Sequence, residues 1–347
     1  MLGRFIKPVY LGLRGLGLKV FVRSDRGLAL PQHISSLLVI TDSRLGDVCL
    51  AIPVLQSLRS AYPQANFAVV LPQYLHGLVQ WSCRPDIVFD GRDARIRQQA
   101  RWDVAIDLST DYFLKPAQLA WHSGARVRIG FDYSDRGVYF THPIAAPPPD
   151  EHAQVTYTKV LDALGIPFKR TALPSLTGNA ATAVNSATIA VHPGAHHPTQ
   201  RWPAEHFAEL IKRIQRGGEH CMVLGSSREK DLVSTVARLA MGATCMITDD
   251  VLELAAVLQN SSMLICNNSG PLHLAGLLGI PTLSFMGPTV KSRWWPLGSD
   301  AIVLRRDDLL CIGCNLGYCK IRTHACMKEI TAEQAFAAYN RRRIEVR

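Results

Sequence analysis

The sequence predicts an α/β protein with two doubly wound domains, each built around a parallel sheet. From Ser36 onward, short apolar runs alternate with longer helix-like stretches, which is typical of parallel strands joined by helices. The pattern stops in Gly165–Asn185, which is rich in proline, threonine, alanine and glycine, and then starts again. A chain of 347 residues, 48% hydrophobic and 19% charged, is long and apolar enough for two folded cores.

The first run of elements lies before this linker. Short apolar runs predict strands at Leu37–Thr41, Phe67–Leu71, Ile87–Phe89, Val104–Asp107 and Val127–Ile129. Longer stretches predict helices at Val48–Ala61 and Gln154–Leu164.

The second run repeats the same alternation after the linker. Its strands are predicted at Thr188–His192, Cys221–Leu224, Met263–Cys266 and Thr282–Phe285. Its helices are predicted near Ala204–Gln215, Arg228–Met241 and Leu252–Gln259. The repetition predicts two doubly wound domains joined by a linker, with a cleft between them.

The formal net charge of +10 is concentrated at the two ends of the chain. Residues 1–34 carry a net +5 and residues 341–347 a net +3, whereas the middle is nearly neutral. A nucleic-acid groove across the core is therefore not expected. Basic ends interleaved with apolar residues suit an anionic membrane surface better.

Targeting signals and membrane spans are not expected in this sequence. Charges interrupt every apolar run well short of the roughly 20 residues that a spanning helix needs. The first residues lack the uncharged stretch and cleavage site of a secretory signal. The nine cysteines are then expected in a reducing compartment, where structural disulfides are rare.

Ligands of open parallel sheets bind beyond the carboxyl ends of the strands, so the loops after strands should carry the chemistry. A dinucleotide fingerprint is missing there, because the glycine triplet Gly12, Gly15 and Gly17 follows no strand. The loop Thr41–Val48 contains Asp47, which could cap the next helix or act as a general base. In the same loop, Arg44 is a candidate to steer an acidic substrate.

The first strand of the second domain leads into the loop His192–Pro203. Gly194 permits close backbone approach, Thr199 offers a hydroxyl, and Arg201 offers a guanidinium that matches phosphate oxygens. The adjacent histidines 196 and 197 raise the possibility of a metal, but no acidic or cysteine partner stands at ligand spacing. A solvated loop is favoured.

Two further strand tips in this domain carry glycine and polar residues. In Leu224–Lys230, Glu229 could hold ribose hydroxyls or complement a helix dipole, and Lys230 could face a phosphate. In Cys266–Gly276, Ser269 and Pro271 suit a helix start, whose free N–H groups favour an anion. These tips outline a nucleotide-diphosphate pocket, although a capped helix with a surface histidine, His273, is the simpler alternative.

Three segments together resemble glycosyltransferase family 9, which contains the ADP-heptose:lipopolysaccharide heptosyltransferases. They are Ser43-Arg44-Leu45-Gly46-Asp47, His192-Pro193-Gly194-Ala195 with Arg201-Trp202-Pro203, and Asn268-Ser269-Gly270-Pro271-Leu272-His273-Leu274-Ala275. The resemblance covers roughly residues 36–335. It implies the GT-B fold, with two facing Rossmann-like domains and a cleft between them. It also implies a sugar nucleotide on the second domain and inversion at the anomeric carbon, with no metal or cofactor.

Site residues follow from the resemblance position by position. Asp47 matches the proposed catalytic base, and Ser269, Gly270 and His273 match the turn that contacts the diphosphate. Asn268 stands where the family often has aspartate, and Arg201 where it often has lysine. These two departures leave room for a different sugar nucleotide.

The expected activity is heptose transfer from ADP-heptose to a lipopolysaccharide core acceptor, an acidic lipid-linked oligosaccharide. The expected location is cytoplasmic, peripheral on the inner face of the cytoplasmic membrane. The alternatives are transfer of another nucleotide-diphosphate sugar in cell-envelope assembly, or a non-catalytic nucleotide-sugar-binding membrane assembly protein.

This function assigns a role to each part of the chain. Residues 1–34 are expected to form a basic amphipathic segment, 35–168 the acceptor domain, and 186–330 the nucleotide-sugar domain. A basic helix at 331–347 is expected to return to the N-terminal domain.

Four of the nine cysteines, Cys311, Cys314, Cys319 and Cys326, form a C-x2-C-x4-C-x6-C cluster. Cytosolic cysteines gathered in this way can bind zinc, although the x4 spacing does not match common zinc modules. Reduced thiols, a structural metal and redox pairing all remain open at the level of sequence, and no catalytic metal is assigned.

Overall fold

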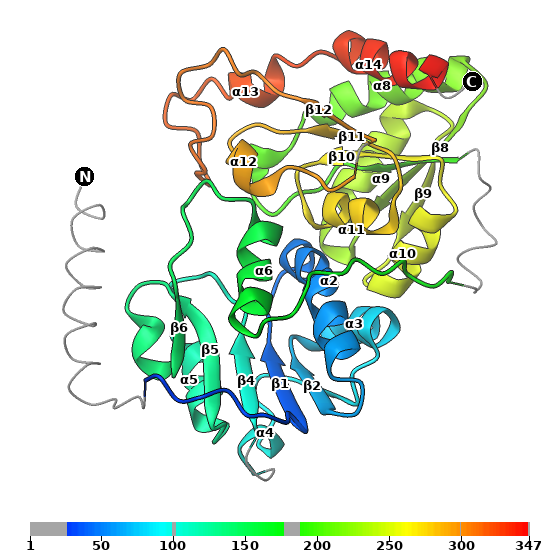
Figure 1. Ribbon diagram of the computed structural model, residues 1–347. Helices are drawn as coiled ribbons and strands as arrows, with labels where there is room; N and C mark the ends of the chain where they lie inside the picture. Colours follow the sequence, from blue (N-terminus) through cyan, green and yellow to red (C-terminus); the bar gives the residue numbers. More distant parts are fainter. Residues whose placement is uncertain (1–25, 99–101, 177–187, 299, 346–347) are drawn as a thin grey trace. The chain divides into compact units, whose positions relative to one another are not determined.

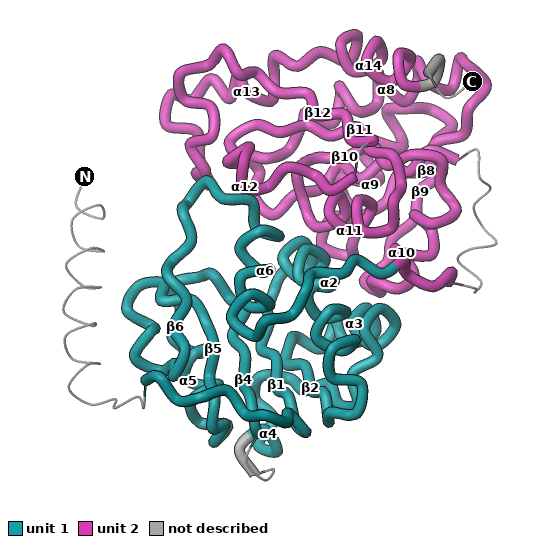
Figure 2. The backbone as a smooth tube through the Cα atoms, in the orientation of Figure 1, with its two compact units in different colours: residues 1–171 teal, residues 172–347 magenta. Residues whose placement is uncertain are grey.

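The computed structural model describes residues 26–98, 102–176, 188–298 and 300–345. The chain divides into two compact units, Met1–Thr171 and Ala172–Arg347 (Figure 2). We call them unit 1 and unit 2 and describe each by itself. The predicted basic N-terminal segment consists largely of residues 1–25, which lie outside the described residues.

In unit 1, the described residues form one parallel sheet in the order β3-β2-β1-β4-β5-β6 (Figure 1). Its strands are β1 (Ser36–Ile40), β2 (Asn66–Val70), β3 (Ile87–Phe89), β4 (Val104–Asp107), β5 (Val127–Asp132) and β6 (His142–Ala145). Its helices are α2 (Leu45–Ala61), η1 (Gln73–Leu75), α3 (His76–Cys83), α4 (Arg95–Gln98), α5 (Lys115–His122), η2 (Arg136–Tyr139) and α6 (Ala153–Ala163).

Unit 2 repeats this plan with a parallel sheet in the order β12-β11-β10-β7-β8-β9 (Figure 1). Its strands are β7 (Thr188–His192), β8 (His220–Gly225), β9 (Thr244–Ile247), β10 (Met263–Asn267), β11 (Thr282–Phe285) and β12 (Ala301–Leu304). Its helices are η3 (Pro198–Gln200), α8 (Ala204–Arg216), η4 (Ser227–Glu229), α9 (Lys230–Ala240), α10 (Val251–Gln259), α11 (Gly270–Leu278), α12 (Lys291–Trp294), α13 (Ala325–Lys328) and α14 (Ala332–Glu345).

The two predicted parallel α/β sheets are confirmed, and the central strands explain why. Every residue of β7 and β10 is buried, as are the last four of β1, because helices cover both faces of a parallel sheet. Such strands must be apolar throughout and are recognisable in a sequence. In unit 2 the core centres on Trp202, which stacks on Phe285 with ring centroids 3.8 Å apart.

The edge strands β6, β9 and β12 were not predicted. Their residues are mostly exposed or half-buried, so their sequences lack the continuous apolar run of a central strand. In unit 1, the short helices α3 and α5 were missed as well. The stretch predicted as one helix at Arg228–Met241 is divided between η4 and α9.

The last helix does not follow the expectation that it returns to the N-terminal domain. Helix α14 packs within unit 2, against α8 and β11. Its residues Ala335, Ala338 and Tyr339 are buried in the core that surrounds Trp202. Apolar side chains on one face of α14 therefore tie it to the second sheet.

No helix among the described residues is long and apolar enough to cross a membrane.

Candidate active site

In unit 1, Asp47 lies just beyond the carboxyl end of β1. Helix α2 begins at Leu45, three residues earlier than predicted, so Asp47 sits inside its first turn. The cap position is Arg44, whose side chain makes no capping hydrogen bond. The Asp47 side chain is only 5% exposed. The structure thus places a nearly buried carboxylate at the edge of the sheet where ligands of such folds bind.

Arg44 and Tyr157 both contact the Asp47 carboxylate. Arg44 Nε lies 3.3 Å from Oδ2, and the Tyr157 hydroxyl donates to Oδ1 at 3.3 Å from helix α6. Burial lowers the pKa of Arg44, but the carboxylates of Asp47 and Asp42 raise it above its ordinary value overall. The Arg44 guanidinium therefore stays charged beside Asp47. Tyr157 was not predicted, because nothing in the sequence connects it to a residue so distant in the chain.

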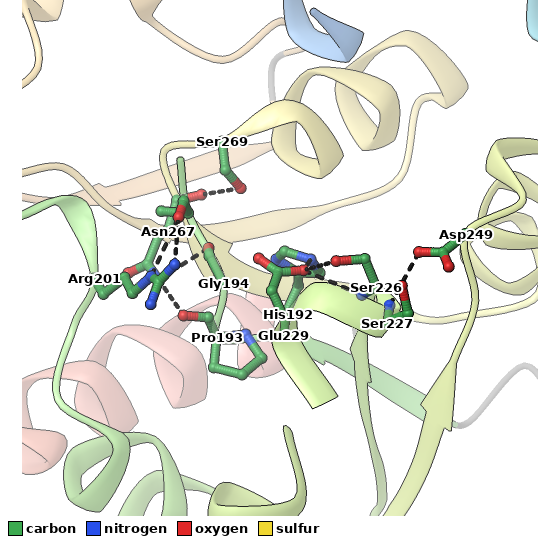
Figure 3. A network of polar contacts seen from close by, with 11 residues as sticks. His192, Pro193, Gly194, Arg201, Ser226, Ser227, Glu229, Asp249, Asn267 and Ser269 are labelled. Carbon is green, nitrogen blue, oxygen red and sulfur yellow. Dashed lines mark hydrogen bonds and ion pairs between the residues drawn. The ribbon is translucent and has the colours of Figure 1, made fainter. Parts of the chain in front are cut away.

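In unit 2, the buried side chain of Asn267 organises the loop that follows β7. Its Nδ2 donates to the carbonyls of Pro193 at 2.8 Å and Gly194 at 3.2 Å, and its Oδ1 accepts from the Trp202 backbone N–H at 2.9 Å (Figure 3). All three partners belong to the loop His192–Pro203. Asn267 was not singled out from the sequence, although its place at the end of a buried strand was a usable signal.

Glu229, which follows the end of β8, lies against the same loop. Its Oε2 accepts from the backbone N–H of Ser226 at 3.1 Å and its hydroxyl at 2.8 Å, and lies 3.5 Å from His192 Nε2 (Figure 3). Burial would raise the pKa of Glu229, but the bonds from His192 and Ser226 outweigh it and lower the pKa to about 2. Glu229 is therefore an ionised hydrogen-bond acceptor at neutral pH.

Gly194 is required by this arrangement. A Cβ atom on Gly194 would lie 1.8 Å from Glu229 Oε1 and 2.9 Å from a ring carbon of His192. Only glycine lets the loop pass so close to the carboxylate. The sequence predicted that a group would lie close to the backbone at Gly194. In the structure this group is the side chain of Glu229.

The other predicted donor residues differ in what they face. Arg201 donates twice to the Ala195 carbonyl, from Nε at 3.2 Å and Nη2 at 3.0 Å. The Thr199 hydroxyl turns away from the loop and donates to the Leu316 carbonyl at 2.9 Å. Lys230 is exposed at the first residue of α9. The Thr199 hydroxyl therefore makes a contact within unit 2 instead of facing a ligand from the loop as was predicted.

The turn between β10 and α11 follows the predicted strand-to-helix plan. Helix α11 starts at Gly270 with Pro271 in its first turn, and Ser269 holds the cap position. The expected cap by Ser269 is wrong, since its hydroxyl instead donates to the Asn267 carbonyl at 3.3 Å (Figure 3). The first N–H groups of α11 thus donate no hydrogen bond to the cap side chain, which leaves them suited to an anion.

Asn268 and His273 flank this helix start and are both buried. Asn268 Nδ2 donates to the Trp294 carbonyl at 2.9 Å, and the His273 ring lies 6.0 Å from the Trp294 ring. Both residues therefore contact α12, and His273 is not the surface histidine of the simpler alternative.

The cysteine cluster lies in a loop-rich stretch of unit 2 with all four thiols free. Burial, with the neighbouring cysteines, raises the pKa of Cys326 to about 11, which favours the neutral thiol. Among the described ranges, no group of three or more His, Cys, Asp or Glu side chains is placed to hold a metal ion. Reduced thiols, a structural metal and redox pairing of these cysteines all stay predictions.

Comparison with known proteins decides the family. The model of glycosyltransferase family 9 (heptosyltransferase) matches residues 94–319. The chain belongs to this family. Lipooligosaccharide heptosyltransferase 2 of Campylobacter jejuni is 23% identical over 152 residues, which cover 42% of this chain and 48% of that protein. The chain therefore spans about half the length of this curated family 9 relative.

Solved structures agree with the family 9 fold. The structure of the E. coli ADP-heptose LPS heptosyltransferase II matches with a TM-score of 0.73 and 19% identity, covering 89% of this chain and 99% of that one. An E. coli heptosyltransferase solved with ADP matches with a TM-score of 0.70 and 17% identity, covering 88% and 99%. The expected GT-B class of two α/β sheets is confirmed.

Proposed function

We propose that this family 9 chain is an inverting glycosyltransferase that moves a heptose from ADP-heptose to a lipopolysaccharide core acceptor. The observation that carries the proposal is the environment of Asp47, a nearly buried carboxylate held by Arg44 and Tyr157 at a strand tip. A module that only binds a sugar nucleotide has no need of a base in its other unit. The related heptosyltransferases, one of them solved with ADP, support the choice of donor.

In the proposed reaction, Asp47 takes the proton of the acceptor hydroxyl as that oxygen attacks the anomeric carbon of the donor. The bond from the anomeric carbon to the diphosphate breaks on the opposite face, so the configuration inverts. A sugar hydroxyl has a pKa far above neutral, which is why a base must accept its proton as the bond forms. The products are the extended saccharide, the protonated carboxyl of Asp47 and the nucleotide diphosphate.

Unit 2 would stabilise the departing diphosphate. The first N–H groups of α11 and the guanidinium of Arg201 supply positive charge where the negative charge develops. Glu229, ionised and held beside Gly194, is suited to accept hydrogen bonds from ribose hydroxyls. None of these steps draws on a metal.

The departures at Asn268 and Arg201 favour one alternative, a different nucleotide-diphosphate sugar. Both side chains are committed to backbone carbonyls, of Trp294 and Ala195 respectively. A donor with a different sugar part would still find the N–H groups at the start of α11 for its diphosphate.

A direct assay separates these possibilities. The purified chain is incubated with ADP-heptose and a heptose-deficient lipopolysaccharide core, and the product is weighed by mass spectrometry. We expect a mass gain of one heptosyl group, and no gain with UDP-glucose. Transfer from UDP-glucose but not from ADP-heptose would show that the donor sugar is not heptose. If the chain binds ADP but transfers no sugar, a non-catalytic assembly protein is favoured.

The proposed location is peripheral, on the inner face of the cytoplasmic membrane. Deletion should be confined to residues 1–25, because Ile34 is 7% exposed and the Gly27 N–H donates to the Thr141 carbonyl at 3.4 Å. Residues 26–34 therefore belong to the folded unit 1. The shortened chain is expected to lose salt-sensitive binding to anionic vesicles and to keep its melting temperature; unchanged vesicle binding would refute the proposed location.

A further inference from the structure

Two adjacent aromatic side chains are exposed in the loop between β4 and α5. Tyr112 is 38% exposed and Phe113 is 54% exposed. Their ring centroids lie 4.5 Å apart with an angle of 33° between the ring planes. We call this pair the aromatic platform. Two large rings that present apolar surface side by side suit a ligand with an apolar face.

The platform lies at the same edge of the sheet as Asp47. Strands β4 and β1 lie side by side in the sheet (Figure 1). They pair in parallel with Asp107 opposite Ile40, and the Leu108 N–H extends the pairing to the Ile40 carbonyl at 2.9 Å. The loops that leave these two strands therefore start side by side. The carboxylate of Asp111, next to Tyr112, contributes to the raised pKa of Arg44, which places the two loops within electrostatic reach.

A third aromatic residue flanks the Asp47 loop from its other side. Tyr74 follows β2, the other neighbour of β1, and is 50% exposed. Its hydroxyl donates to the Ser43 carbonyl at 2.8 Å, which ties it to the loop that holds Asp47. Aromatic side chains thus stand on both sides of the proposed base.

Arg136 is bonded to the backbone of the loop that carries the platform. It is fully buried, and its Nη1 donates to the Ser109 hydroxyl at 2.9 Å and the Phe113 carbonyl at 3.1 Å. Its Nη2 also donates to the Ser109 carbonyl. Removing a guanidinium from water costs free energy, which hydrogen bonds must offset. Here those bonds go to Ser109 at one end of the loop and to Phe113 at the other. Arg136 is a positioning residue, and the rings it positions are preorganised.

We infer that the aromatic platform binds a neutral sugar ring of the acceptor, with its C–H face against Tyr112 and Phe113, beside Asp47. The inference rests on the proposed function. A pyranose ring has an apolar C–H face that packs on aromatic rings and a rim of hydroxyls that donate hydrogen bonds. Asp42, Asp47 and Asp111 are suited to accept such bonds.

An anionic lipid surface is the competing ligand for exposed aromatic side chains, and the local charge disfavours it. The buried cation Arg136 is paired with the carboxylate of Asp107. Outside that pair, the three carboxylates Asp42, Asp47 and Asp111 outnumber the two cations Arg44 and Lys115. An anionic leaflet would be repelled by that excess, whereas uncharged hydroxyls are not.

The test measures acceptor binding directly, without turnover. Phe113→Ala, Tyr112→Ala and Tyr112→Phe are compared by calorimetry in the full chain with ADP present. The probe is a deacylated, heptose-deficient lipopolysaccharide core oligosaccharide. Trp121→Ala is the matched control, since Trp121 is also 38% exposed but lies near the far end of α5.

We expect each alanine variant at the platform to weaken oligosaccharide binding about tenfold, which corresponds to roughly 1.4 kcal/mol. Tyr112→Phe keeps the ring and should bind as the wild type does, as should Trp121→Ala, and ADP affinity should not change in any variant. Unchanged oligosaccharide affinity in both alanine variants would overturn the inference, and so would a wild-type chain that does not bind the oligosaccharide.

Two further outcomes distinguish the inference from its rival and from the proposed function. If the alanine variants lose binding to phosphatidylglycerol-containing vesicles but keep the oligosaccharide, the platform is a lipid contact and the inference fails. If they lose the oligosaccharide while the wild type transfers no sugar from ADP-heptose, the proposed function fails and the saccharide site stands.

Discussion

Arg136 and Asp107 form an ion pair in which both side chains are fully buried, with Nη2 3.7 Å from Oδ2. Burial raises the pKa of Asp107, and Arg136 and Ser109 offset only part of this effect. The Asp107 Oδ1 accepts from the Ser109 backbone N–H at 2.9 Å and its hydroxyl at 2.6 Å. The pair joins the end of β4 to η2, so its loss should lower the stability of unit 1 as a whole.

Replacing Arg136 by methionine should therefore destabilise the protein strongly. The change leaves Asp107 as an uncompensated buried carboxylate, which typically costs about 3–5 kcal/mol of unfolding free energy. Arg95→Met is the matched control, because the Arg95 side chain is 65% exposed and its ion pair with Asp93 should add little to the stability. Urea unfolding measures both. Equal, small losses would show that the buried pair adds nothing specific.

Replacing Asp47 by asparagine should abolish sugar transfer while ADP binding stays intact. The amide keeps the shape of the side chain but does not accept the hydroxyl proton, and general bases typically contribute about 10²–10⁴-fold to the rate. The measurement is kcat with ADP-heptose, together with calorimetry of ADP. Asp162→Asn, on the exposed side of α6, should keep its turnover. A variant at Asp47 that kept most of its turnover would leave this residue a structural role only.

Replacing Arg201 or His273 by alanine should weaken ADP binding more than adenosine binding. Hydrogen bonds to charged groups contribute about 1.5–3 kcal/mol each, and only the diphosphate carries the charge. Calorimetry with both ligands gives the comparison, and Arg213→Ala, whose partner is Glu209 on the same helix, serves as the control. Equal losses for ADP and adenosine would place these two side chains away from the phosphates.

Replacing Gly194 by alanine should displace Glu229 and weaken ADP binding. The added Cβ would overlap Glu229 Oε1 at 1.8 Å, so either the loop or the carboxylate must move. Overpacking of this kind typically costs about 1–3 kcal/mol in stability. Gly91→Ala is the control, because its nearest neighbour would be 3.9 Å away. Melting curves and ADP calorimetry test the pair; an alanine variant that binds and melts like the wild type contradicts this packing.

Glu229 should make stability depend on pH in the acid range. Its pKa is about 2 in the folded protein against 4.5 ordinarily, so its ionised form is stabilised by folding. The contribution is complete above about pH 4.5 and is lost as the pH falls towards 2, and it amounts to roughly 2–4 kcal/mol. Urea unfolding at several pH values should show a smaller slope for Glu229→Gln than for the wild type. Glu205→Gln, exposed on α8, should keep the wild-type slope.

The sequence predicted the central strands and the loops of the site much better than their contacts. Strands such as β7 and β10 are buried on both faces, so their sequences are apolar without interruption. The loops that follow them were located because glycine and polar residues interrupt those runs. The edge strand β9 was not predicted, since its mostly exposed residues do not form an uninterrupted apolar run.

Local helix chemistry was predicted only in part. Pro271 does lie in the first turn of α11, because its fixed φ suits that position in any protein. The cap by Ser269 did not form, since its hydroxyl has the Asn267 carbonyl within reach. Local preference names the candidates, and competing partners from the fold decide among them.

What the sequence by itself determined is therefore the class of the fold, the family and the strand tips that carry the candidate residues. These follow from periodicity, glycine and proline placement and short motifs, which are local. The tertiary structure alone decided that Tyr157 contacts Asp47 across 110 positions, that Asn267 accepts from Trp202 across 65, and that Arg136 meets Ser109 across 27. Such pairs form because the folding of each unit around its own sheet brings distant side chains together in low-dielectric surroundings, where each polar group must find a partner.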